Sequence, residues 1–194
     1  MNDTIITLAP RRGPRNAADM HRAIAAATET DTDRVLWAWP VPELVIIRSA
    51  TTPNWGLIHG ATKATIHPAP TPTAGDRIHW ALIANPTRRD GVGPRATGNY
   101  DRPGTGKRIA VPEEDLPAWA AAKLATALDA ENITTKRLPG ARGESSNGGR
   151  ITITRYAIAG DAAVTDPAAL AALMRDGIGS GKAYGCGLLQ VGAA

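Results

Sequence analysis

The chain has 194 residues, which is enough for one large domain or two small ones with a buried core. Its 22 Lys and Arg residues outnumber its 18 Asp and Glu residues and give a formal net charge of +4. The single cysteine, Cys186, excludes an intramolecular disulfide and a cysteine-rich zinc site. No basic segment followed by an apolar one marks a signal peptide, and no apolar run approaches the ~20 residues of a membrane span, so we expect a soluble, cytoplasmic protein.

The first half of the chain is predicted to mix strands with one helix. Asn16 is a suitable N-cap for a helix that runs to about residue 27. Residues 51–72 contain several prolines and are expected to be irregular. Strands are expected where β-branched and apolar residues dominate or alternate, at residues 4–9, 35–39, 44–49 and 77–84. This order is that of a ferredoxin-like unit in which the irregular connector replaces the second helix.

The second half is predicted to repeat this order of elements. Pro112 and the three acidic residues after it suit the first turn of a helix, whose apolar stripe continues to Leu128. A second helix is expected at residues 168–175, after Asp166 and Pro167. The remaining strands are expected at residues 133–138, 151–158 and 188–191.

We therefore predict an α+β fold of two tandem ferredoxin-like (RRM-like) units with antiparallel sheets. Residues 1–84 are assigned to the N-terminal unit, residues 85–108 to a basic linker and residues 109–194 to the C-terminal unit.

A glycine-rich loop precedes the last predicted strand. It reads Gly177-Ile178-Gly179-Ser180-Gly181-Lys182-Ala183-Tyr184-Gly185-Cys186-Gly187. Glycines permit close backbone approach, and exposed backbone N–H groups with a lysine suit a phosphate. The order helix, loop, strand and the residue after Lys182 do not match a Walker loop or a dinucleotide-binding fingerprint. Spacing alone leaves two interpretations, a phosphate-binding loop and a plain turn that closes a sheet edge.

Positive charge is concentrated in two stretches that are rich in Gly, Pro, Ser or Thr. Residues 85–111 contain Arg88, Arg89, Arg95, Arg102, Lys107 and Arg108. Residues 134–155 contain Lys136, Arg137, Arg142, Arg150 and Arg155. Basic loops suit nucleic acid, because phosphate contacts dominate its affinity for proteins. The alternative is that these are solvated loops whose charge only keeps the protein soluble.

The glycine-rich loop resembles the C-terminal loop of the CasE family, the CRISPR repeat-RNA endonucleases. Residues 16–24, Asn-Ala-Ala-Asp-Met-His-Arg-Ala-Ile, resemble the family's first helix, which carries its catalytic histidine. Residues 83–87, Ile-Ala-Asn-Pro-Thr, resemble a strand end that reads Arg-Ala-Asn-Pro in relatives, with Ile83 replacing the arginine. Because length, order and spacing agree, the resemblance covers essentially the whole chain.

The resemblance implies a catalytic role for His21, since histidine moves protons near neutral pH. Lys182 is then a candidate for stabilising charge on the phosphorane, and Gly179 and Gly181 for close approach to RNA. Relatives often carry a tyrosine where this chain has Ala18, and Tyr184 is a candidate to fill that role.

Each of these site residues also has a simpler interpretation. Arg22 either orients the phosphate or is a solvated helix residue. His21 alone would be read as a surface residue, and Tyr184 as a packing residue.

What the resemblance implies for function is metal-independent cleavage of the stem-loop of CRISPR repeat transcripts. The ribose 2′-hydroxyl would be the nucleophile, the product would end in a 2′,3′-cyclic phosphate, and the enzyme would keep its RNA and join other Cascade subunits. No cofactor is expected, and the four histidines show no metal-ligand spacing. The alternatives are a non-catalytic RNA-binding subunit of the same assembly and a two-domain scaffold unrelated to RNA.

Overall fold

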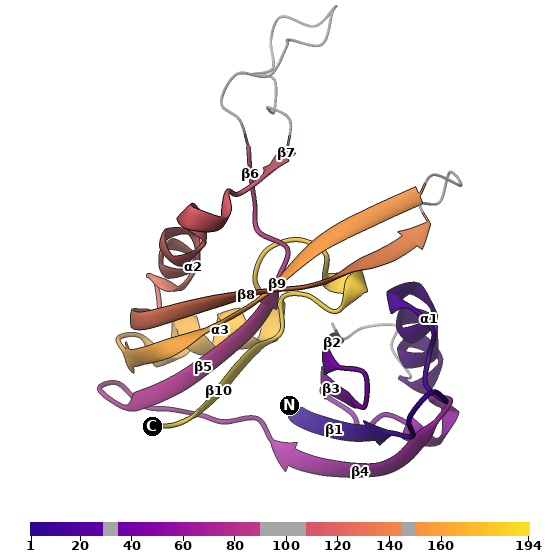
Figure 1. Ribbon diagram of the computed structural model, residues 1–194. Helices are drawn as coiled ribbons and strands as arrows, with labels where there is room; N and C mark the ends of the chain where they lie inside the picture. Colours follow the sequence, from indigo (N-terminus) through magenta and orange to yellow (C-terminus); the bar gives the residue numbers. More distant parts are fainter. Residues whose placement is uncertain (29–34, 90–107, 145–149) are drawn as a thin grey trace, which may run out of the picture.

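Two four-stranded antiparallel sheets form the framework of the molecule (Figure 1). The computed structural model describes residues 1–28, 35–89, 108–144 and 150–194. The first sheet has the strand order β2-β3-β1-β4, and the second has the order β10-β5-β9-β8. The predicted α+β fold of two ferredoxin-like units is confirmed, because each sheet has the strand order of that fold.

The first unit is built from β1 (Asn2–Leu8), α1 (Ala17–Ala27), β2 (Leu36–Val41), β3 (Leu44–Ser49) and β4 (Ala61–Pro68). The helix begins as predicted after Asn16, whose side-chain oxygen accepts a hydrogen bond of 2.9 Å from the Asp19 N–H. The prediction of an irregular connector at residues 51–72 was wrong, because β4 lies within it and pairs along β1. β4 is an edge strand, where the missing N–H of a proline is tolerated.

The strand β5 (Arg77–Ala84) forms where it was predicted but belongs to the other unit. We expected it to complete the first sheet, and it instead lies between β9 and β10 in the second. The position beside β1 is already taken by β4. With β5 as its first strand, the second unit has the complete order strand, helix, strand, strand, helix, strand.

The other elements of the second unit are α2 (Leu116–Leu124), β8 (Leu128–Glu144), β9 (Arg150–Val164), α3 (Pro167–Asp176) and β10 (Leu189–Ala193). The predicted helix ends four residues earlier than expected, and Leu128 starts a strand instead. β8 also runs through Pro139 and Gly140, which were expected in a loop. The register shifts between Leu138 and Ala141, so a β-bulge accommodates the proline.

At the two ends of the predicted linker, β6 (Thr87–Arg89) and β7 (Arg108–Ala110) pair as a short antiparallel ladder, and β7 extends two residues beyond the predicted boundary at residue 108. The predicted RNA-binding residues Arg95, Arg102 and Lys107 lie outside the described residues.

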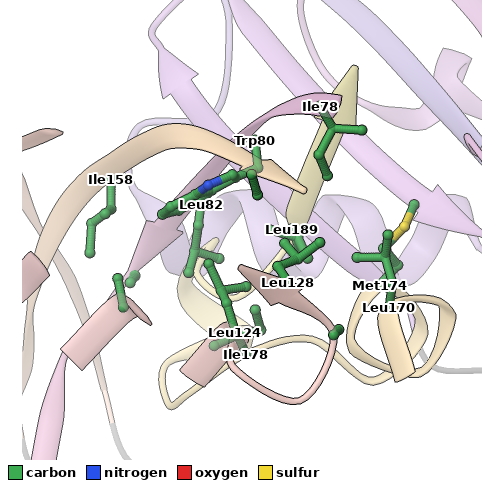
Figure 2. Close-up of a cluster of buried hydrophobic side chains, with 14 of the residues drawn as sticks. Ile78, Trp80, Leu82, Leu124, Leu128, Ile158, Leu170, Met174, Ile178 and Leu189 are labelled. Carbon is green, nitrogen blue, oxygen red and sulfur yellow. The ribbon is translucent and has the colours of Figure 1, made fainter. Parts of the chain in front are cut away.

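The larger core lies between the second sheet and helices α2 and α3 (Figure 2). Ile78, Trp80 and Leu82 alternate along β5 and are all buried on the face that the two helices cover. The intervening His79 and Ala81 are exposed on the opposite face. The core of the first unit packs Met20 and Ile24 of α1, among others, against β1, β2 and β3.

A third apolar cluster joins the two units, and Cys186 lies within it. The cluster includes residues from both units, among them Ile46 of β3 and Ile83 of β5. Cys186 is fully buried and packs as a small apolar residue, ahead of β10 rather than within it. Burial raises the pKa of the Cys186 thiol to about 12.

Arg48 of β3 makes polar contacts across the interface between the two units, which we call the joint. Its guanidinium donates two hydrogen bonds of 2.6 Å to the carboxylate of Asp3 on β1. It also donates to the Leu189 carbonyl at 2.6 Å and the Met174 carbonyl at 3.3 Å, both in the second unit. In the described part of the chain, no helix is long and apolar enough to cross a membrane.

Candidate functional site

A groove between the two units brings together His21 and Lys182, two predicted site residues that are far apart in the sequence. Met20 and Ile24 turn one face of α1 into the core, which leaves His21 exposed at the border of that face. Lys182 is presented by η3 (Lys182–Tyr184), a single helical turn within the glycine-rich loop. The groove has a volume of about 270 Å³ and is lined by His21, Ile24, Ala25, Thr28, Val35, Leu36, Trp37, Lys182 and Ala183. It offers an imidazole and an ammonium group on largely apolar walls.

The ammonium group of Lys182 is held at the end of a helix. Its Nζ donates a hydrogen bond of 2.6 Å to the carbonyl oxygen of Asp176, the last residue of α3. A cation at a helix C-terminus interacts favourably with the helix dipole and the unsatisfied carbonyls. Lys182 therefore has a structural partner, and this partner fixes where its charge lies.

The glycines of the loop have structural reasons to be glycine. Gly185 has φ +74°, and an added Cβ would lie 2.7 Å from the ring of Trp37. Gly181 has φ +80°, and its Cβ would lie 3.3 Å from the Cβ of Asn85. At these two positions the loop needs glycine to turn and to pack against its own protein.

Tyr184 packs partly buried against the core of the first unit. It is not among the described residues that line the groove of His21 and Lys182. These contacts support a packing role for Tyr184.

A second groove joins the glycine-rich loop to the first basic stretch. Its volume is about 580 Å³, and its lining combines cations with loop backbone: Thr87, Arg88, Arg89, Arg108, Trp119, Ala122, Lys123, Gly179 and Ser180. The exposed Gly179 thus lies beside three arginines predicted from sequence to meet RNA. Sequence reasoning missed Lys123, although a basic residue in the last turn of α2 was visible. Arg88 is also ion-paired with Asp115 at 3.3 Å.

The second basic stretch lies on the β8–β9 hairpin. Lys136, Arg137 and Arg142 of β8 are all exposed, and Arg137 pairs loosely with Glu113 at 3.5 Å. The position of the Arg150 side chain is not described. Arg22 on α1 is exposed and pairs with Asp19 at 2.5 Å. The structure therefore places exposed basic side chains on both the linker strands and the hairpin.

A histidine on the far face of the second sheet belongs to a different cluster. The Nδ1 of His79 lies 2.6 Å from the Asp161 carboxylate, whose other oxygen accepts a bond of 2.9 Å from Asn132. The Asn132 amide and the His79 ring hold the pKa of Asp161 below its usual range. The described residues contain no group of three His, Cys, Asp or Glu side chains placed to hold a metal ion.

A family model for CRISPR-associated proteins matches residues 4–192. The chain belongs to this family. The resemblance to CasE proteins is confirmed by the CRISPR-associated endoribonuclease Cse3 of Thermus thermophilus, which is 28% identical over 94% of this chain and 93% of that protein.

Solved structures of CRISPR-associated proteins share the fold. The Cas6e protein of Escherichia coli K-12 matches with a TM-score of 0.75 and 23% identity over the full length of both chains. A structure of the endoribonuclease Cse3 bound to a 19-nucleotide RNA has a TM-score of 0.71 and 26% identity, covering 98% of this chain and 97% of the other. A chain of a CRISPR RNA-guided surveillance complex has a TM-score of 0.68 and 22% identity, with both chains fully covered.

Proposed function

We propose that this protein is a metal-independent endoribonuclease that cuts the stem-loop of CRISPR repeat transcripts. The observation that carries the proposal is the groove in which α1 supplies His21 and the glycine-rich loop supplies Lys182. A relative that matches along nearly the whole chain is named an endoribonuclease. The two residues have the chemistry that cleavage of an RNA phosphodiester needs.

RNA supplies its own nucleophile in this mechanism. The 2′-hydroxyl attacks the adjacent phosphorus, the bond to the 5′-oxygen breaks, and a 2′,3′-cyclic phosphate forms. The 2′-hydroxyl loses a proton and the departing 5′-oxygen gains one. His21 carries out one of these two transfers, a form of catalysis that contributes ~10²–10⁴-fold, and solvent water carries out the other. Lys182 stabilises the negative charge of the phosphorane. Ala18 leaves no phenol one turn before His21, so these two groups carry the reaction without it.

The basic surfaces bind the RNA in this proposal. Arg88, Arg89 and Arg108 line a groove together with the glycine-rich loop, and the β8–β9 hairpin carries further exposed cations. Duplex RNA is recognised mainly through its shape, its 2′-hydroxyls and its phosphates. A related Cse3 is solved with RNA and a chain of this fold sits in a surveillance complex, which supports retention of the cut RNA and assembly with Cascade subunits.

The test is incubation of the protein with a labelled repeat hairpin in excess EDTA. We expect cleavage that leaves a cyclic phosphate, and we expect His21→Ala to lose at least ~10²-fold in rate while its hairpin affinity stays near wild type. A strict Mg²⁺ requirement or a 3′-hydroxyl product would rule out the 2′-hydroxyl mechanism.

The second candidate is a non-catalytic RNA-binding subunit, which Ala18 favours because the family's usual phenol is missing. In the same experiment it predicts a hairpin that is bound but uncut. A hairpin that is neither bound nor cut would leave only the structural scaffold.

A further inference from the structure

A separate cavity lies where the start of α1 meets the β8–β9 hairpin. Its volume is about 240 Å³, and three of its lining residues are arginines: Arg15, Arg142 and Arg155. The other lining residues are Asn16, Ala17, Trp39, Gly140 and Ala141. Its lining comes from both units. α1 and β8 contact each other, and Figure 1 shows the β8–β9 hairpin reaching out beside α1.

Arg155 of β9 is buried without a full set of acceptors. Only 9% of the residue is exposed. Its Nε donates to the Pro139 carbonyl at 3.0 Å, but its buried Nη1 has no partner among the described residues. Burial lowers the pKa of Arg155, yet a guanidinium stays charged in proteins. A buried charge without a counter-ion is costly, and the usual remedy is an anion.

The same fold shows what a purely structural buried arginine looks like. Arg48 is 1% exposed, and its guanidinium is satisfied by the Asp3 carboxylate and two carbonyl oxygens. Arg155 has no carboxylate within ion-pair distance in the described part of the chain. The contrast shows that Arg155 lacks, among the described residues, the counter-ion that Arg48 has.

The surroundings of Arg155 favour an anion as that acceptor. Arg15 and Arg142 line the cavity and are exposed, and Asn16 and Ala17 place the N-terminal end of α1 there. Helix N-termini attract anionic oxygens. The nearby carboxylate, Asp19, is already shared between Arg15 at 3.3 Å and Arg22 at 2.5 Å.

We propose that this cavity binds a backbone phosphate of the RNA strand, close to the phosphate that is cut. This inference rests on the proposed function, because it places a second phosphate contact on the helix that carries His21. Ala17 at the cavity and His21 at the groove are about one helical turn apart, ~5.4 Å along the axis. Arg155 and Arg142 would each donate to the phosphate oxygens, and Arg155 would gain the acceptor that its Nη1 lacks.

The test compares wild type with Arg155→Met and Arg142→Ala for binding of the uncut repeat hairpin at several salt concentrations. We expect each variant to raise the Kd, Arg155→Met by about 10- to 100-fold, the range for losing hydrogen bonds between charged groups. Each should also flatten the dependence of log affinity on log salt by about 0.7–0.9. Arg77→Met is the matched control, since Arg77 is an exposed arginine at the start of β5 that is paired with Glu131.

The stability of the RNA-free protein separates a binding role from a structural one. Arg155→Met removes a buried charge that has no counter-ion, which offsets the loss of the hydrogen bond to the Pro139 carbonyl, so the variant should melt close to wild type. A lower melting temperature with unchanged hairpin affinity would make Arg155 structural and overturn the inference. If Arg155→Met does not fold, Arg142→Ala decides, because its side chain is exposed.

Two further outcomes identify other occupants. If inorganic phosphate raises the melting temperature of wild type but not of Arg155→Met, while both bind the hairpin equally, the cavity holds a free anion and the RNA inference fails. If wild type neither binds nor cuts the hairpin, the proposed function fails and the inference falls with it. If wild type binds and cuts, and the cavity variants match it, only the inference is lost.

Discussion

Lys182 combines a structural contact with a proposed catalytic role, and the two have different consequences. Its hydrogen bond to the Asp176 carbonyl closes the end of α3, and a cation in that place contributes about 0.3–1 kcal/mol. We expect Lys182→Ala to lose about that much unfolding free energy and, in addition, to cut the hairpin far more slowly. Lys63→Ala on the exposed edge strand is the control. Denaturant melts and single-turnover cleavage measure both effects, and a variant that is less stable but fully active would make Lys182 purely structural.

Asp161 gives a prediction about acid stability. Hydrogen bonds from Asn132 and His79 depress the pKa of its carboxyl in the folded state. A group with a depressed folded pKa stabilises the fold above its unfolded pKa, which for Asp is ≈ 3.9, and this stabilisation is lost as pH falls through the folded pKa. We expect Asp161→Asn to be less stable than wild type at neutral pH and the difference to shrink below about pH 4. Urea melts across this range check it, and a difference that is constant with pH would exclude the linkage.

At the residue scale, the sequence predicted the groove residues better than the cavity residues. His21 and Lys182 belong to motifs with recognisable spacing, so both could be named before the structure brought them into one groove. Arg155 could only be counted among the basic residues. That its Nη1 has no partner among the described residues depends on burial and on where other chain segments lie, and neither is visible in a single sequence.

At the scale of elements, the strands themselves were easier to predict than the strands with which they pair. The alternation along β5 identified the strand, because period-2 patterning reflects one buried face. The alternation did not indicate to which of the two sheets the strand belongs. β4 was missed because most of its residues are exposed, with only Ala61 and Ala64 partly buried, and an exposed edge strand has little apolar pattern to detect. One missed strand was enough to shift β5 into the wrong unit.

The glycine-rich loop provides a prediction in which conformation and contact can be separated. Gly185 and Gly75 both have positive φ, +74° and +88°, but a Cβ at Gly75 would meet nothing within 4 Å. Gly75→Ala therefore measures the cost of the backbone conformation alone, ~1–2 kcal/mol. Gly185→Ala adds a clash with the ring of Trp37 and should cost clearly more. Thermal melts of the two variants test this, and equal losses would mean that the contact with Trp37 is not tight in solution.

At the scale of the whole molecule, the candidate active groove exists only where the two units meet. His21 comes from the first unit and Lys182 from the second, so their spacing depends on the joint rather than on either sheet. The apolar part of that joint includes Ile46, Ile83 and Cys186. Such a joint could not be predicted from sequence, because its residues look like ordinary members of two separate cores.

Arg48 is the residue on which this joint can be tested. It links Asp3 of the first unit to the Met174 and Leu189 carbonyls of the second, and it is 1% exposed. Removing one partner of a buried ion pair typically costs 3–5 kcal/mol, because the other charge is left uncompensated. We expect Arg48→Met to lose about that much stability, and Arg48→Met combined with Asp3→Leu to recover part of it. Denaturant melts of the single and double variants measure this, and equal losses would show that Asp3 is not the group left unpaired.

The same variants test whether the joint sets the geometry of the groove. At a temperature where the double variant remains folded, the Met174 and Leu189 carbonyls still lack their donor across the joint. We therefore expect slower hairpin cleavage than wild type even when stability is partly restored, because a displacement of about 1 Å between reacting groups can cost ~10²-fold in rate. Cleavage at the wild-type rate by the folded double variant would show that the apolar cluster around Cys186 is enough to keep His21 and Lys182 at their relative positions.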